Sequence, residues 1–111
     1  MQMKMILAVI QDRDWVNLSK ELTKNGFGVT KLSSTGGFLR QGNTTVMIGV
    51  DEERIESVLG IIKRQCKKRD IPMTLYPPSI TGLNMTSPPV NVTVGGATVF
   101  VLNVERFEHL E

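Results

Sequence analysis

A pair of glycines followed by an aromatic residue carries the clearest chemical signal in the sequence. Gly36 and Gly37 precede Phe38 and Leu39 within the segment Thr35–Asn43. Glycine permits positive φ angles and lets backbone N–H groups approach a ligand closely, and phenylalanine can pack on an aromatic base. The segment is also longer than the roughly 2–5 residues of an ordinary hairpin connection. This pattern fits a site for a ligand that carries both phosphate and an aromatic ring.

Polar residues of the same segment support this interpretation. Arg40 adds a cation, and Asn43 adds an amide that can both donate and accept hydrogen bonds at a base edge. A second interpretation fits equally well, in which the glycines form a turn whose apolar tip packs on a neighbouring chain. The residues by themselves leave both interpretations open.

A near match to the phosphate loop of nucleoside triphosphatases is excluded. Residues 37–44 spell G-x-x-x-x-G-N-T, so Asn43 stands where the phosphate loop has its lysine. The phosphate loop must also open a helix, whereas residues 45–50 are rich in β-branched types and predict a strand. We therefore expect no ATPase.

Composition limits the class of protein. The 111 residues predict a single domain, 1–111, that buries its core without disulfides. Cys66 and His109 are the only residues of their types, which excludes a disulfide framework or a Cys/His metal cage within one chain. We therefore expect a cytoplasmic location and no cofactor. We expect no membrane span because no apolar run is long enough, and a net charge of +2 does not indicate a nucleic-acid polymer as partner.

Hydrophobic periodicity predicts strands and helices in alternation. The apolar run 4–11 predicts a strand in the middle of a sheet, and residues 28–34 and 44–50 predict two more. Apolar residues at helical spacing predict a first helix near 14–25, which begins at Asp12 or Asp14 as the N-cap and ends at Asn25-Gly26: Trp15, Leu18 and Leu22.

The second half of the chain predicts one more helix, a long loop and a hairpin. Five residues fall on one buried face of a helix capped by Asp51: Ile55, Val58, Leu59, Ile62 and Cys66. Basic residues at 63–69 complement the dipole of that helix, and a patch that binds phosphate or nucleic acid is the alternative, although no aromatic residues interleave. Prolines and glycines in 70–89 predict a long flexible loop, and 90–94 with 97–104 predict a closing hairpin around Gly95-Gly96.

These elements predict an α+β fold. Strand, helix, strand, strand, helix, strand is the order of a ferredoxin-like βαββαβ sandwich, here with an extra C-terminal strand and both helices on one face of the sheet. The other face needs cover. Packing it against identical faces of further copies would produce a symmetric oligomer.

The stretch from Lys31 to Thr45, K-L-S-S-T-G-G-F-L-R-Q-G-N-T-T, resembles the signature of the PII-like cyclic di-AMP receptor family of Gram-positive bacteria. The resemblance extends to residues 3–12 and 94–101. It implies a non-enzymatic signalling protein that forms a homotrimer and binds cyclic di-AMP in a cleft between each pair of neighbours. Ligand binding would change the conformation of the loops and so regulate an unknown downstream protein.

The resemblance also implies which residues contact the ligand. They fall on Thr30, Leu32, Gly37, Phe38, Leu39, Asn43, Gly49 and Phe100. The aromatic rings offer faces or edges to adenine, the polar side chains can hydrogen-bond its edges, and the glycines let backbone approach closely. For Phe100, ordinary core packing in a strand is an equal alternative.

Departures from the family leave alternatives open. Members that bind the ligand carry an asparagine and an arginine where this chain has Gly26 and Gly28, so another small nucleotide or a weaker site is an alternative. A second alternative is a constitutive trimeric scaffold. A third is a small ferredoxin-like phosphatase that uses Arg13 and an asparagine, although residues 11–14 lack the glycines of a phosphate cradle.

Overall fold

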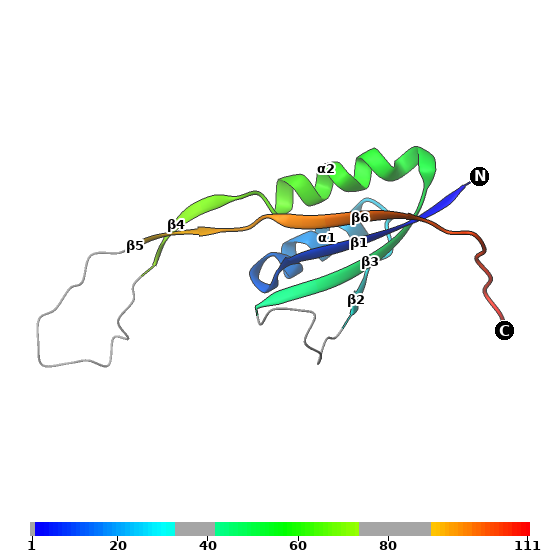
Figure 1. Ribbon diagram of the computed structural model, residues 1–111, viewed down its shortest axis with the longest axis horizontal. Helices are drawn as coiled ribbons and strands as arrows, with labels where there is room; N and C mark the ends of the chain where they lie inside the picture. The colour runs from blue at the N-terminus through cyan, green and yellow to red at the C-terminus, as the bar shows by residue number, and fades with distance from the viewer. Residues whose placement is uncertain (1, 33–41, 74–89) are drawn as a thin grey trace, which may run out of the picture.

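The computed structural model describes residues 2–32, 42–73 and 90–111 (Figure 1). One antiparallel sheet has the strand order β2–β3–β1–β6, with β1 (Met3–Gln11), β2 (Thr30–Leu32), β3 (Asn43–Asp51) and β6 (Ala97–Asn103). The helices α1 (Trp15–Lys24) and α2 (Ile55–Gln65) each follow a 3-10 turn, η1 (Asp12–Asp14) and η2 (Glu52–Arg54). This order and connectivity confirm the predicted α+β, ferredoxin-like βαββαβ fold.

Alternation along the two central strands gives the sheet two different faces. Successive side chains of a strand point to opposite faces, and every second side chain is buried along β1 from Ile6 to Ile10 and along β3 from Val46 to Val50. The buried ones pack in one cluster with apolar residues of both helices: Ile6, Ala8, Ile10, Val46, Ile48 and Val50 with Leu18, Leu22, Val58, Ile61 and Ile62. The core therefore lies between the sheet and the helix layer.

Helix α1 ends at the predicted glycine. Gly26 has a φ of 83°, its N–H donates to the carbonyl of Thr23 at 3.0 Å, and the Phe27 N–H donates to the carbonyl of Leu22 at 2.9 Å. These two bonds form a Schellman motif, which satisfies carbonyls that the helix end would leave without partners. Neither α1 nor α2 is long and apolar enough to cross a membrane.

The predicted acidic caps of the helices are wrong. Asp14 occupies the N-cap position of α1 and Asp51 precedes η2, but neither side chain makes a capping hydrogen bond. The Asp12 carboxylate instead accepts a hydrogen bond from the Thr44 hydroxyl. The Asp14 carboxylate accepts one from the guanidinium of Arg69, with an Nη2–Oδ1 distance of 2.8 Å. Partners brought in from distant parts of the chain compete successfully with the local backbone N–H groups.

The prediction of an unbroken loop over 70–89 is wrong at its first residues. Strand β4 (Arg69–Met73) pairs antiparallel with β5 (Val90–Val94) in a separate two-stranded sheet, while the rest of the predicted loop, 74–89, lies outside the described residues. Pro72 is tolerated because each strand of a two-stranded sheet is an edge and can leave one N–H side without a ladder bond. We call β4 and β5 together the β4–β5 arm. It projects away from the four-stranded sheet (Figure 1).

The predicted closing hairpin is also wrong. Strand β6 pairs with β1 and not with β5. Gly95 and Gly96 have φ angles of 91° and 94°, and they join the arm to the main sheet instead of folding a hairpin. The added element is therefore a strand pair inserted between α2 and β6, not an extra strand at the C-terminus. Strand β6 ends at Asn103, one residue earlier than predicted, and residues 104–111 follow it without helix or strand.

Candidate functional site

The sheet face opposite the helices carries the predicted ligand contacts that the structure describes. Paired residues of antiparallel strands point to the same face. Thr30 pairs with Met47, Met47 with Leu7, and Leu7 with Phe100, so one row crosses the whole sheet. Leu7 and Met47 alternate with residues of the core, which places this row on the side away from the helices.

We call this side the open face. Leu32, Asn43 and Gly49 lie on it as well. Asn43 and Gly49 are each an even number of positions from Met47 along β3, and their partners on β1 are Gln11 and Met5. Leu32 pairs with Thr45, which is also an even number of positions from Met47. All five predicted contacts within the described residues therefore share one face. The other three lie outside the described residues: Gly37, Phe38 and Leu39.

The shared face does not bring all five contacts together within one chain. Thr30 lies on the edge strand β2 and Phe100 on the opposite edge strand β6, with β3 and β1 between them. At about 4.8 Å per strand, these two residues are roughly 14 Å apart. The Phe100 side chain is 54% exposed, so the alternative of ordinary core packing is wrong within this chain.

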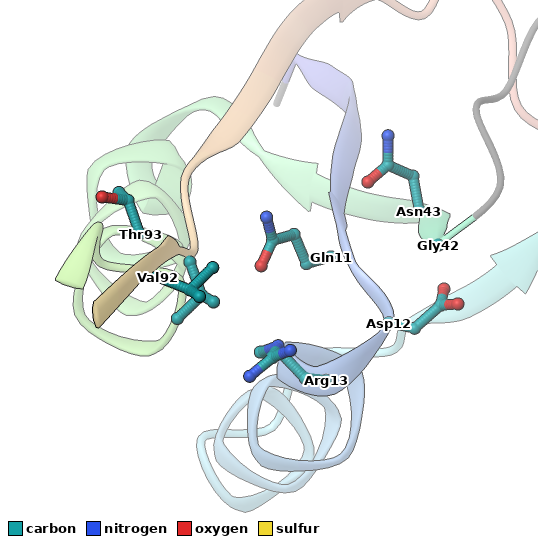
Figure 2. A pocket seen from close by; sticks show the side chains of 8 residues that line it. Gln11, Asp12, Arg13, Gly42, Asn43, Val92 and Thr93 are labelled. Atoms are coloured by element: carbon teal, nitrogen blue, oxygen red, sulfur yellow. The ribbon is translucent and has the colours of Figure 1, made fainter. Parts of the chain in front are cut away.

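Two cavities open where β1 and β3 meet the arm, and they share Gln11 and Asn43. The first, of about 510 Å³, extends toward β5 (Figure 2), and we call it the Arg13 cavity: Gln11, Asp12, Arg13, Gly42, Asn43, Val92, Thr93 and Val94 line it. The second, of about 330 Å³, extends toward the start of β6, and we call it the Lys68 cavity: Val9, Ile10, Gln11, Asn43, Lys68, Gly95, Gly96, Ala97 and Thr98 line it.

A hydrogen bond fixes the wall between the two cavities. The Gly95 N–H donates to Oε1 of Gln11 at 2.8 Å, which ties the base of the arm to the end of β1. A Cβ added at Gly95 would lie 2.2 Å from the carbonyl oxygen of Lys67, so this junction admits only glycine. Figure 2 shows Gln11 between the strand that carries Thr93 and the start of β3. The amide of Gln11 is therefore held in place before any ligand arrives.

Three residues at the site were not among the predicted ligand contacts. Gln11 looks like the last residue of an apolar strand, and Lys68 belongs to a basic run that the helix dipole already explains. Thr45 lies on the open face, and its buried hydroxyl oxygen has no hydrogen-bond partner among the residues that the structure describes. Only the pairing of strands and the return of the chain after α2 bring these side chains to the site.

Cys66 is a core residue, as predicted. It is 3% exposed. Burial, with a smaller contribution from the negative charge of Asp14, raises the pKa of the Cys66 thiol from 9.0 to about 11. The thiol is therefore protonated at neutral pH. Within 2–32, 42–73 and 90–111, no group of three or more His, Cys, Asp or Glu side chains is placed to hold a metal ion.

Comparisons with known proteins identify the family. The sequence model of the family described as "Cyclic-di-AMP receptor" matches residues 3–110. The crystal structure of a functionally unknown protein from Pediococcus pentosaceus is 44% identical, with 99% of each chain covered and a TM-score of 0.79.

Two more distant solved structures are similar in fold. The B. subtilis GlnK–ATP complex is 20% identical, over 93% of this chain and 82% of that one, with a TM-score of 0.58. Arabidopsis thaliana PII bound to citrate is 18% identical, over 93% and 78%, with a TM-score of 0.54. At these identities the likeness shows the fold, which is PII-like. The chain belongs to the cyclic-di-AMP receptor family, and it is a PII-like signalling protein that binds cyclic di-AMP.

Proposed function

We propose that three copies of this chain form a ring and bind cyclic di-AMP in clefts where the β2 side of one copy meets the β6 side of the next. The observation that carries this proposal is the position of the predicted contacts. Thr30 and Phe100 share the open face but lie on opposite edges of the sheet. The site is therefore incomplete within one chain, and a head-to-tail contact between two different edges closes into a ring.

The apolar character of the open face supports the same assembly. Leu32, Phe100 and Leu102 are 37%, 54% and 43% exposed. Leu7 and Met47, in the middle of the sheet, are only partly buried. A contiguous apolar surface of this kind is typical of an interface, because exposing it to water is unfavourable. Burying part of it between copies leaves Leu32, Phe100 and the polar groups at the Asn43 end available for the ligand.

Each described contact has a chemical role in this cleft. Leu32 and Phe100 offer apolar surface to adenine, and the Asn43 amide can pair with a base edge. A Cβ added at Gly49 would meet nothing closer than the end of Met3 at 3.8 Å, so packing within the chain does not require glycine there. In the proposed trimer, glycine at this position allows close approach of the ligand or of a neighbouring copy. The Thr45 hydroxyl, which lacks a partner among the described residues, supplies a further polar group.

The output of the protein is a change of loop conformation that a downstream protein recognises in the cytoplasm. The sequence predicts that segments 35–43 and 70–89 undergo this change, of which 35–41 and 74–89 lie outside the described residues. Gln11 supports the second of them as part of the response, because it separates the two cavities and also holds the base of the β4–β5 arm through Gly95. Ligand that displaces this bond would release the arm.

Binding without catalysis is part of the proposal. His109 lies on the exposed tail, with Nδ1 3.8 Å from the carboxylate of Glu111, and Cys66 is protonated in the core. The phosphatase alternative has one observation in its favour, since Arg13 and Asn43 line the same cavity. Asp12 also lines that cavity, and its negative charge disfavours a phosphoryl group there. We expect no hydrolysis of p-nitrophenyl phosphate above the buffer rate.

Calorimetric titration with cyclic di-AMP, cyclic di-GMP and ATP tests the proposed function. Cyclic di-AMP should bind, and Phe38→Ala should weaken its binding by about ten- to a hundredfold, because stacking of a base on an aromatic ring is worth roughly 1–3 kcal/mol. Phe107→Ala is the matched control, since this aromatic side chain is 70% exposed on the tail.

Two outcomes would favour the alternatives. A folded trimer that binds none of these nucleotides would identify the chain as a scaffold. Unchanged affinity in a trimeric Phe38→Ala variant would mean that the glycine-flanked tip docks on another protein and does not stack on the base.

A further inference from the structure

We infer that Lys68 holds a phosphate group of the bound dinucleotide at the Asn43 end of the open face. This inference rests on the proposed function, because it assigns a residue to the same site. Lys68 lies in the linker between α2 and β4, far from the glycine-rich segment in the sequence. The fold nevertheless brings it into one cavity with Asn43, a predicted ligand contact.

Charge distinguishes the two cavities. The Arg13 cavity is lined by the cationic Arg13 and also by Asp12, whose carboxylate accepts a hydrogen bond from the Thr44 hydroxyl. In the Lys68 cavity, Lys68 is the only ionisable residue among the described residues that line it. The remaining lining consists of apolar side chains, backbone, the hydroxyl-bearing side chain of Thr98 and the amides of Gln11 and Asn43. A phosphodiester carries a negative charge, so the Lys68 cavity is the more favourable of the two for it.

The backbone that carries Lys68 is fixed on both sides. The carbonyl of Cys66 accepts a hydrogen bond from the Gly96 N–H at 2.6 Å. Arg69 donates to the carbonyl of Lys67 at 2.8 Å and to the buried carboxylate of Asp14 at 2.8 Å. These bonds anchor the linker to the sheet junction and to α1. The lysine is thus presented from a rigid support, which lowers the entropy lost when it binds an anion.

Gly96 leaves the space along which the lysine side chain runs. A Cβ added at Gly96 would lie 3.4 Å from Cε and 3.6 Å from Cγ of Lys68, and the φ of 94° also favours glycine. The stem of Lys68 therefore crosses the glycine backbone and delivers its ammonium group toward the cavity. The adjacent Lys67 is exposed and lines neither cavity, which makes it a matched control.

Calorimetric titration of the full chain with cyclic di-AMP, at low and at high ionic strength, tests the inference. Lys68→Ala should bind about tenfold or more weakly, because a hydrogen bond to a charged group is lost. Its affinity should also depend less on salt, since screening acts on the charge that has been removed. Lys68→Arg should stay within a few-fold of the wild type, and Lys67→Ala should bind normally. Melting temperatures should not change, since both lysines are exposed.

A labelling experiment on the wild type avoids any dependence on how the variants fold. Cyclic di-AMP should protect Lys68, but not Lys67, from acetylation by acetic anhydride as read by mass spectrometry. If the wild type binds while Lys68→Ala binds equally tightly and Lys68 is labelled at the same rate with ligand, the inference is overturned and the proposed function stands. If the wild type binds no cyclic dinucleotide, the proposed function fails, and the role of Lys68 fails with it.

Discussion

Gln11 is the residue that joins the candidate site to the β4–β5 arm. Its side chain lines both cavities, and its Oε1 accepts the N–H of Gly95 at 2.8 Å. Asn43, its antiparallel partner on β3, is the predicted ligand contact nearest to it. A ligand that binds the Asn43 amide therefore lies next to Gln11, whose hydrogen bond to Gly95 positions the arm.

Gly49 is predicted to matter for binding and not for folding. In Gly49→Ala the new methyl group meets no atom closer than 3.8 Å, and the unfolded chain loses entropy. The free energy of unfolding of the monomer unit should therefore stay the same or rise by about 0.4–1 kcal/mol. Cyclic di-AMP affinity should fall by about fivefold or more, because the methyl group overpacks the cleft.

Gly60→Ala serves as the control for this substitution. Gly60 lies in α2, and its added Cβ would meet only the flexible end of Arg64. Normal affinity in both alanine variants would remove Gly49 from the site. Denaturant unfolding and calorimetric titration of the same samples provide the two measurements.

Cys66 is predicted to make stability decrease in alkaline solution. Its pKa rises from 9.0 to about 11 on folding, so the folded state holds this proton more tightly. Below pH 9.0 the thiol is protonated in both the folded and the unfolded state, so its contribution to the free energy of unfolding is complete. As the pH rises from 9.0 to about 11 the unfolded state loses the proton first, and the free energy of unfolding falls. Denaturant melts across this range measure the effect.

Cys66→Ala isolates the contribution of the thiol. The variant should be less stable at neutral pH, because it leaves a small void in the core, but its stability should fall less steeply across the alkaline range. Equal slopes for the variant and the wild type would contradict the assignment. Native wild-type protein should also react slowly with a thiol reagent until it unfolds.

At the scale of secondary structure, Gly26 and Gly28, where the sequence departs from the resemblance, differ in backbone conformation. Gly26 has a φ of 83° at the end of α1, whereas Gly28 precedes β2 without a positive φ, and a Cβ added there meets nothing within 4 Å. Gly28→Arg should therefore fold normally. It should tighten cyclic di-AMP binding by about tenfold or more if this site otherwise matches the family.

Gly26→Asn should behave differently. Asparagine in the left-handed conformation costs less than other residues with a side chain, so we expect a loss of about 1 kcal/mol of stability and a smaller gain in affinity. Melting temperature and affinity measured together separate these effects. A folded Gly28→Arg trimer with no gain in affinity would mean that the pocket serves a different ligand.

The arm is predicted to depend on one ion pair between elements. The Asp14 side chain is 3% exposed, and Arg69 at the start of β4 holds it at 2.8 Å. Arg69→Met leaves this buried carboxylate without its cation, so the free energy of unfolding should fall by roughly 1.5–3 kcal/mol. Hydrogen exchange at β4 and β5 should accelerate more than at β1.

A surface ion pair provides the control for the Arg69 substitution. Arg106 and Glu108 pair on the tail, with 78% and 47% of their side chains exposed. Arg106→Met should change stability by less than about 1 kcal/mol, because water already screens that pair. Equal effects of the two substitutions would show that the Asp14–Arg69 pair does not anchor the arm.

At the scale of the whole molecule, the open face is predicted to hold the trimer together. Light scattering at micromolar concentration should give the mass of three chains without ligand. Leu7→Glu places a charge in the middle of this face, so it should yield monomers that no longer bind cyclic di-AMP. Val16→Glu, at an apolar residue of α1 that is 54% exposed, should remain trimeric. A monomeric wild-type protein would contradict the ring.

Much of the chain was predictable because its signals are local. The apolar run 4–11 and the β-branched residues of 45–50 are local features, and they identified both central strands. The apolar spacing of α2 follows the helical repeat, and only Ile61 was missed among its core residues. Gly26 ended α1 as expected, because a positive φ is a backbone property of one residue.

Tertiary structure decided which distant segments meet. The sequence 90–94 favours a strand but does not say whether that strand pairs with β4 or with β6, since Gly95-Gly96 can form a hairpin turn or a passage between two sheets. Asp14 could cap its own helix, yet a guanidinium 55 residues away gives the carboxylate a stronger partner. Lys68 belongs to a basic run by sequence. It reaches the candidate site only because the linker after α2 is anchored at Gly96 and Asp14, a constraint between elements that no local pattern contains.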